Sequence, residues 1–376
     1  MKGWAVLIWS IGFFVALKEA SAQSLPPVDP TGESHQSHVL SYDRSATPGE
    51  IEIIPRKTVL GYNADADRGY GRIHLTCRSA SDPVNGSCPM ADTSINGAGM
   101  TSIPLRFVER RSGLRTEINV LGSLQRAYGD RRCYREFWND IDRPISTTFG
   151  PVCIDKPAAG TGVSLAINGS ELSRLVAGRW DAELILDLRI ESGGPVVATY
   201  VFTFDLTITD HNAVSIYFPT FDQVTPHIGL NLQYDPVGQT VGGRALLDMC
   251  LYDGLGSQSE YLGVTVRDTG THPPGATGYS VWHADGGSDD TQRVDYTVSL
   301  AHSGARLPMA NGVEQQLRGI DTAQLRLVML PGMTMPVFCV PTPLTLETPS
   351  VPINTKRPGY YSGDLNVELR LPTAIP

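Results

Sequence analysis

The chain has 376 residues, a length that predicts two or three domains. Its 38 glycines and 27 prolines indicate many turns. Charged residues make up only 18% of the chain, which excludes a coiled coil or a disordered acidic chain. The formal net charge is −9 and no lysine or arginine tail is present, which argues against nucleic acid as a partner.

The N-terminal residues predict export. Met1 and Lys2 precede an apolar run from Trp4 to Leu17, and Ala20-Ser21-Ala22 follows as an A-x-A cleavage site. The run is too short to span a membrane as a helix. We therefore interpret residues 1–22 as a signal peptide and expect an exported mature chain beginning near Gln23.

All six cysteines lie in the mature chain, and an even number in an exported protein favours disulfides. Their clustering favours sequential pairs: Cys77 with Cys88, Cys133 with Cys153, and Cys250 with Cys339. No CxxC or HxxxH spacing supports a metal site. The sequence therefore predicts three disulfides, no metal and no cofactor.

Apolar and polar residues alternate with period two through the first half of the chain. Along Arg179–Ile190, every second residue from Trp180 onward is apolar, and Val196–Ile208 repeats the pattern. The turn residues Glu191–Pro195 lie between them and predict a hairpin. Shorter strands are expected at Arg72–Cys77, Ile103–Val108, Thr116–Val120 and Val163–Ile167.

A short helix is predicted at Ser170–Leu175, with Ser170 as its cap. The strand pattern breaks at Asp210–Ala213 and restarts with two apolar series. We place a domain boundary there, with an N-terminal domain at 23–210, a linker at 211–213 and a C-terminal domain at 214–376. The two series are Val214, Ile216 and Phe218, then Ile228, Leu230 and Leu232.

The second half repeats the all-β pattern. Turn clusters at 272–278 and 285–290 separate its expected strands. Two tandem antiparallel β-sandwiches fit this spacing better than one large barrel. The expected strands are Leu262–Val266, Val294–Leu300, Leu325–Met329 and Leu365–Leu371.

The last predicted strand suggests an incomplete sandwich. Leu365, Val367 and Leu369 alternate with polar residues close to the end of the sequence. A sandwich that ends with this strand would lack its closing partner and leave an apolar groove that another chain's strand could fill. The alternative is that an N-terminal strand of the same chain covers this edge.

No motif of a known catalytic site is present. The sequence has no G-x-S-x-G, H-E-x-x-H, P-loop or dinucleotide fingerprint, so we predict no enzymatic activity.

Five motifs together resemble a known family, the CblD-like pilus biogenesis initiators, which are tip subunits of alternate-chaperone fimbriae of the colonization factor antigen I type. Within it, the chain resembles the minor tip subunit of cable pili most closely. The motifs are CRSASDPVNGSCP at 77–89, RWDA at 179–182, DMCLYDG at 248–254, PVFCVP at 336–341 and GYYSGDL at 359–365.

The resemblance implies two immunoglobulin-like sandwiches, an adhesin domain and a pilin domain that lacks its final strand. It implies that the major pilin donates that strand, that a periplasmic chaperone holds the groove beforehand, and that an outer-membrane usher exports the complex. The expected location is the fimbrial tip at the cell surface, and the expected receptor is a host-cell glycan or glycoprotein. Sequential disulfides are also the family pattern.

The family uses exposed arginines of the adhesin domain for receptor binding. The resemblance assigns this role to Arg72, five residues before the first cysteine in a predicted strand. A basic pair that follows the Trp180 strand in relatives is replaced here by Arg189 alone, which leaves shared receptor specificity open. A guanidinium can bind a sialyl carboxylate or a sulfate through two parallel hydrogen bonds.

Two functions therefore remain open. The chain is expected to be a tip adhesin that also initiates assembly, or an assembly initiator while another protein supplies adhesion.

Overall fold

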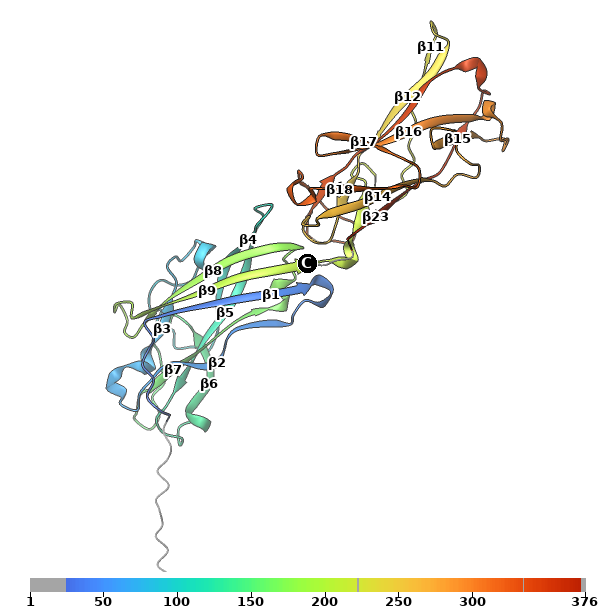
Figure 1. The fold of residues 1–376 in the computed structure, drawn as a ribbon. Helices are drawn as coiled ribbons and strands as arrows, with labels where there is room; N and C mark the ends of the chain where they lie inside the picture. The colour runs from blue at the N-terminus through green and yellow to red at the C-terminus, as the bar shows by residue number, and fades with distance from the viewer. Residues whose placement is uncertain (1–24, 222, 334, 373–376) are drawn as a thin grey trace, which may run out of the picture.

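The computed structural model describes residues 25–221, 223–333 and 335–372, so the predicted signal peptide lies outside the described residues. Strands dominate, and they form two bodies joined end to end (Figure 1). In the described ranges, no helix combines the length and apolar character needed to cross a membrane.

The first body is a nine-stranded sheet that curls around one hydrophobic core. Its strand order is β1-β9-β8-β4-β5-β7-β2, with β3 added to β8 and β6 added to β5. Inward side chains from both ends of this order, such as Ile51 and Phe202, belong to the same buried cluster. The strands are β1 (Glu33–Asp43), β2 (Glu50–Tyr62), β3 (His74–Thr76), β4 (Thr101–Glu109), β5 (Arg115–Ala127), β6 (Trp138–Pro144), β7 (Gly160–Asn168), β8 (Gly178–Arg189) and β9 (Ala198–Thr209).

The predicted long hairpin is confirmed. Strands β8 and β9 pair antiparallel, with Trp180 opposite Leu206 and Leu186 opposite Tyr200. The inward residues are buried because alternate side chains of a strand point to the same face of the sheet.

The predicted helix cap is wrong. Helix α1 spans Gly169–Leu172, and Asn168 rather than Ser170 lies at its N-cap position. The Asn168 side chain makes no capping hydrogen bond, and the N–H of Gly169 donates to the carbonyl of Gly49 at 2.7 Å. Only a glycine fits there, since a Cβ on Gly169 would lie 2.3 Å from the carbonyl oxygen of Pro48.

The predicted strand at Arg72–Cys77 begins later than expected. Strand β3 covers only His74–Thr76, and Arg72 ends a 3-10 turn at Tyr70–Arg72. Gly69 enters this turn with a φ of 73°, a left-handed conformation that favours glycine. Gly71 packs so closely on Ala158 that a Cβ would lie 2.0 Å from the Ala158 carbonyl oxygen.

The second body contains three sheets. Their orders are β10-β13-β20-β19, then β11-β12-β21-β16-β15-β22 with β17 on β16, and β18-β14-β23. The strands are β10 (Ser215–Tyr217), β11 (Leu232–Asp235), β12 (Thr240–Leu247), β13 (Cys250–Tyr252), β14 (Tyr261–Asp268), β15 (Tyr279–His283), β16 (Arg293–His302), β17 (Ala305–Met309), β18 (Glu314–Arg318), β19 (Arg326–Val328), β20 (Val337–Pro341), β21 (Leu344–Pro352), β22 (Tyr361–Ser362) and β23 (Leu365–Arg370).

One expected apolar series of this half is only partly a strand. Strand β11 begins at Leu232, while Ile228 and Leu230 precede it in irregular chain. Both residues are half-buried and pack against the second core, so their alternation reflects burial without strand pairing.

Three disulfides join the six cysteines, Cys77–Cys88, Cys133–Cys153 and Cys250–Cys339, which are the pairs that the clustering favours. The loop that the first disulfide closes fills the space between β4 and β8. Within it, the Ser87 N–H donates to the Pro104 carbonyl at 3.0 Å, and Asn85 Nδ2 donates to the Glu183 carbonyl at 3.3 Å. This disulfide therefore holds the loop in place between strands β4 and β8.

The junction between the two bodies is packed. Cys250, Tyr252, Val328, Leu330, Val337 and Cys339 of the second body belong to the hydrophobic cluster of the first. Arg111, in the β4–β5 turn, donates through Nη2 to the carbonyls of Ile320 (2.6 Å) and Ala323 (2.9 Å). In the connecting segment, Asp210 pairs with Arg44 at 2.8 Å and its N–H donates to the Gly254 carbonyl at 2.7 Å.

Candidate functional site

The predicted receptor-binding arginines lie at the end of the first domain that faces away from the junction. Gly178, the first residue of β8, lies beside Gly256 of the second domain, since a Cβ on Gly256 would be 2.6 Å from the Gly178 Cα. Arg189 ends the same strand eleven residues later, roughly 35 Å away at about 3.3 Å per residue. We call this far end the distal end and define it by residues 69–73, 92–96, 147–149 and 189–194.

The side chain of Arg72 is available to an external ligand. Its exposed fraction is 56%, and its ion pair, between Nη2 and Glu191 Oε1, is long at 3.5 Å. An exposed pair of this kind contributes little free energy, so an incoming anion can displace it at small cost. Arg72 is thus a cation held on a turn with an exchangeable partner.

Arg189 is less available than Arg72. It is half-buried, and its Nη1 donates to the Gly194 carbonyl in the β8–β9 turn. The structure therefore places both arginines at the distal end, but the guanidinium of Arg189 closes a turn of its own chain. Its proposed contribution to a receptor is correspondingly weaker.

A buried arginine lies beneath this surface. Arg126 on β5 is fully buried, and its guanidinium donates from Nη1 to the Ile73 carbonyl (2.8 Å), from Nη2 to the Thr147 carbonyl (2.6 Å) and from Nε to the Phe149 carbonyl (3.1 Å). Burial lowers the pKa of Arg126 to about 9, with nearby Arg143 adding to the effect. The side chain therefore remains charged at neutral pH.

A partly buried carboxylate binds the same segment as Arg126. Asp92 accepts hydrogen bonds from the N–H (3.0 Å) and hydroxyl (2.7 Å) of Thr148 and from the N–H (2.8 Å) and hydroxyl (3.0 Å) of Ser94. These hydrogen bonds outweigh partial burial and hold the pKa of Asp92 far below its usual value. Asp92 therefore joins its own segment to residue 148, and the Ser192 hydroxyl of the β8–β9 turn adds to the lowering of its pKa.

The sequence analysis missed Arg126 and Asp92, although Arg126 had a detectable signal. The inward positions of β5 are Ile118, Val120, Gly122 and Leu124, and Arg126 is the next member of that series. An arginine at an inward position of a strand must be paired or hydrogen-bonded internally. The predicted strand at Thr116–Val120 ended too early to include it. Asp92 lies in irregular chain, where no periodicity marks it.

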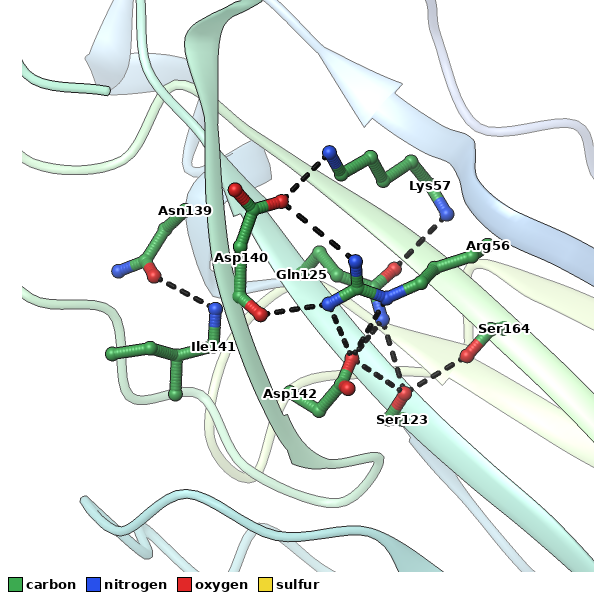
Figure 2. Close-up of polar contacts among 9 residues, drawn as sticks. All are labelled: Arg56, Lys57, Ser123, Gln125, Asn139, Asp140, Ile141, Asp142 and Ser164. Atoms are coloured by element: carbon green, nitrogen blue, oxygen red, sulfur yellow. Dashed lines mark hydrogen bonds and ion pairs between the residues drawn. The ribbon is translucent and has the colours of Figure 1, made fainter. Parts of the chain in front are cut away.

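A separate charged cluster on β2, β5 and β6 is balanced within itself (Figure 2). Asp142 accepts from Arg56 Nη2 (3.2 Å) and Gln125 Nε2 (2.7 Å), and Asp140 accepts from Lys57 Nζ (2.7 Å). The neighbouring Lys57 ammonium lowers the pKa of Asp140. Two cations meet two carboxylates here, so this cluster has no excess charge with which to select an ionic ligand.

Among the described residues, no group of three or more histidines, cysteines, aspartates or glutamates is placed to hold a metal ion.

The second candidate site is the edge of strand β23. Leu365, Val367 and Leu369 pack against the second core but remain half-buried. In the part of the chain that the structure describes, β23 pairs with β14 along one edge, and no strand pairs with its other edge. An extended peptide could add its backbone to this edge and cover the three apolar side chains.

Two tandem immunoglobulin-like sandwiches, the second with an open edge at its last strand, define a two-domain all-β protein whose second domain can accept an added strand. The family model of the first domain of CfaE, a CFA/I fimbrial subunit, matches residues 19–211, and the model of its second domain matches residues 214–373. The chain therefore belongs to the CfaE family of CFA/I fimbrial subunits.

Individual relatives agree with this assignment. The CFA/I fimbrial subunit CfaE of Escherichia coli is 27% identical over 371 residues, which cover 96% of this chain and 95% of the relative. The crystal structure of CfaE, the adhesive subunit of CFA/I fimbria of enterotoxigenic Escherichia coli, matches with a TM-score of 0.70 and 24% identity, over 93% of this chain and 95% of that one. A chaperone–tip adhesin complex of CFA/I fimbriae matches with a TM-score of 0.67 and 24% identity, over 92% and 98%. The closer likeness to the cable-pilus protein stays a prediction.

Proposed function

We propose that this fimbrial subunit lies at the fimbrial tip, where its first domain binds a host-cell glycan or glycoprotein and its second domain initiates assembly. The receptor-binding role rests on the exposed guanidinium of Arg72, which a 3-10 turn holds about 35 Å from the junction. The relatives are fimbrial subunits, one of them described as adhesive. A role in binding and assembly, without catalysis, follows from this proposal.

The ligand chemistry follows from the arginine. A planar guanidinium presents two parallel N–H donors that match a carboxylate or a sulfate, and each charge-assisted hydrogen bond contributes roughly 1.5 to 3 kcal/mol. We therefore expect an acidic glycan, sialylated or sulfated.

The test is binding of the full chain to epithelial cells and to a glycan panel at fixed salt, with wild type, Arg72→Ala and Arg115→Ala. Arg115 is also exposed but begins β5, whose other end carries Arg126, so it lies at the junction end of the domain. We expect Arg72→Ala to lose binding and Arg115→Ala to retain it. If wild type itself does not bind, the second function, assembly initiation with adhesion supplied by another protein, becomes the leading account.

For the second domain, we propose that the major pilin donates a strand to the free edge of β23, over Leu365, Val367 and Leu369. A periplasmic chaperone would hold this edge first, and an outer-membrane usher would export the complex to the cell surface. One of the similar structures is itself a chaperone–tip adhesin complex, which supports a chaperone as a partner.

Strand donation is tested with a synthetic peptide of the major pilin's N-terminal extension. A ligand that binds only the folded state stabilises it by about 4 kcal/mol when present at about 1,000 times its Kd. We expect the peptide to raise the melting temperature of the wild-type chain and to have little effect on Val367→Asp, which places a charge in the groove. An unchanged wild-type melting temperature at saturating peptide would contradict strand donation.

A further inference from the structure

We propose that Arg126 and Asp92 are positioning residues that fix the receptor-binding surface of the distal end from beneath, by joining its loops into one network. This inference rests on the proposed function of Arg72 and names the groups that hold Arg72 in place.

The network begins on both sides of Arg72. The Arg126 guanidinium binds the Ile73 carbonyl directly, at 2.8 Å from Nη1. The same nitrogen donates to Thr161 Oγ1, whose hydroxyl donates to the Tyr70 carbonyl at 2.7 Å. The carbonyls of Tyr70 and Ile73, two residues before and one residue after Arg72, are therefore both tied to one buried cation.

Arg126 and Asp92 meet through a shared segment. Arg126 binds the carbonyls of Thr147 and Phe149, while Asp92 binds the N–H and the hydroxyl of Thr148 between them. Three consecutive residues thus alternate between the cation and the anion. Neither charge can move without moving this segment.

The network extends toward the β8–β9 turn. The Ser192 hydroxyl lies close enough to Asp92 to help lower the pKa of that carboxyl, and the preceding residue, Glu191, is the ion-pair partner of Arg72. The contacts therefore run from Arg126 to the turn that carries Arg72, and from Arg126 through residues 147–149 to Asp92 beside the β8–β9 turn. They support the segments on which Arg72 and its exchangeable partner are held.

Stability alone does not account for the arginine. Burying a guanidinium carries a desolvation cost that an apolar side chain would avoid, and among the described residues no carboxylate forms an ion pair with Arg126. An inward leucine would continue the apolar series of β5. An arginine, however, has five donors in a fixed plane and can bind carbonyls from separate segments at once. Such support is what a binding surface built on loops requires.

The experiment compares Arg126→Met, Arg126→Lys and Asp92→Asn with wild type in the full chain. Two quantities are measured: hydrogen exchange of peptides covering 69–76, 145–151 and 189–197, and binding to epithelial cells. We expect Arg126→Met to speed exchange in these three segments and leave the second domain unchanged. We also expect it to weaken binding tenfold or more, about 1.4 kcal/mol. Lysine, which keeps the charge but has fewer donors in no fixed plane, should restore part of both.

Asp92→Asn keeps the shape of the side chain but weakens the hydrogen bonds that it accepts. It is the test variant if Arg126→Met does not fold. We expect faster exchange at 145–151 and 189–197 and weaker binding. Unchanged exchange at these segments, or wild-type binding despite faster exchange, would overturn the inference. If Arg72→Ala binds like wild type, the proposed receptor role of Arg72 fails, and the exchange data still decide whether the two ions position the loops.

Discussion

The last strands of the two domains come from the same kind of sequence and end in different environments. Strand β9 lies between β1 and β8, and its inward residues are buried, with Phe202 only 1% exposed. Strand β23 has the same alternation but one neighbour, and all its inward residues remain half-buried. The alternating pattern determines which face of a strand is apolar, whereas the number of neighbouring strands determines how far that face is buried.

The two domains therefore obtain their stability in different ways. The first domain closes its core with its own strands, while the second leaves apolar surface uncovered at one edge. We therefore expect the second domain to depend more on its disulfide. Three sets of substitutions test whether the two domains differ in this way.

The largest expected difference concerns the disulfides. In the chain-entropy description, the stabilisation grows with the loop that is closed, to about 4.6 kcal/mol for Cys250–Cys339 and about 2.8 kcal/mol for Cys77–Cys88. Their sequence separations are 89 and 11 residues. We expect the double alanine variant of Cys250 and Cys339 to lose more free energy of unfolding in urea titrations. An equal or larger loss for the Cys77–Cys88 variant would show that the second domain does not depend more on its disulfide.

The next difference concerns single side chains on the two last strands. Phe202→Ala should cost about 3 to 5 kcal/mol because it opens a cavity in a closed core. Val367→Ala should cost about 0.8 kcal/mol because its side chain is only half removed from water. Val298→Ala is the matched control, since Val298 is buried within the second domain. If Val367→Ala costs as much as Val298→Ala in urea denaturation, the edge is already covered.

The smallest effect concerns an ion pair that ties β23 to β18. Arg370 contacts Glu314 at 2.5 Å and lowers the pKa of that carboxyl below its usual value of 4.5. The pair therefore stabilises the fold above pH 4.5, and this stabilisation is lost as the pH falls through the lowered pKa. We expect Glu314→Gln to lower the melting temperature slightly at pH 7, and the difference from wild type to shrink as the pH falls below 4.5. A difference that persists at low pH would show that the glutamate acts through packing.

Much of the fold could be predicted because period-two alternation is a local signal. The β8–β9 hairpin and the apolar face of β23 depend on it directly. The start of β3 could not be predicted, since it depends on the close contact of Gly71 with Ala158, which lies 87 positions further along the chain. The distal-end network was missed for a related reason: Arg126 and Asp92 act through backbone carbonyls and amides, whose positions depend on the folded chain.

The shared junction core limits how the protein can be divided. Six residues of the second domain, including Tyr252 and Val337, lie in the hydrophobic cluster of the first. A chain truncated at residue 210 would therefore present fresh apolar surface to water on the face opposite Arg72, and exposed patches of this kind promote self-association. A first domain prepared alone needs polar replacements on that face. Without them, self-associated copies of the domain would attach to cells through several sites at once and imitate strong binding by a single domain.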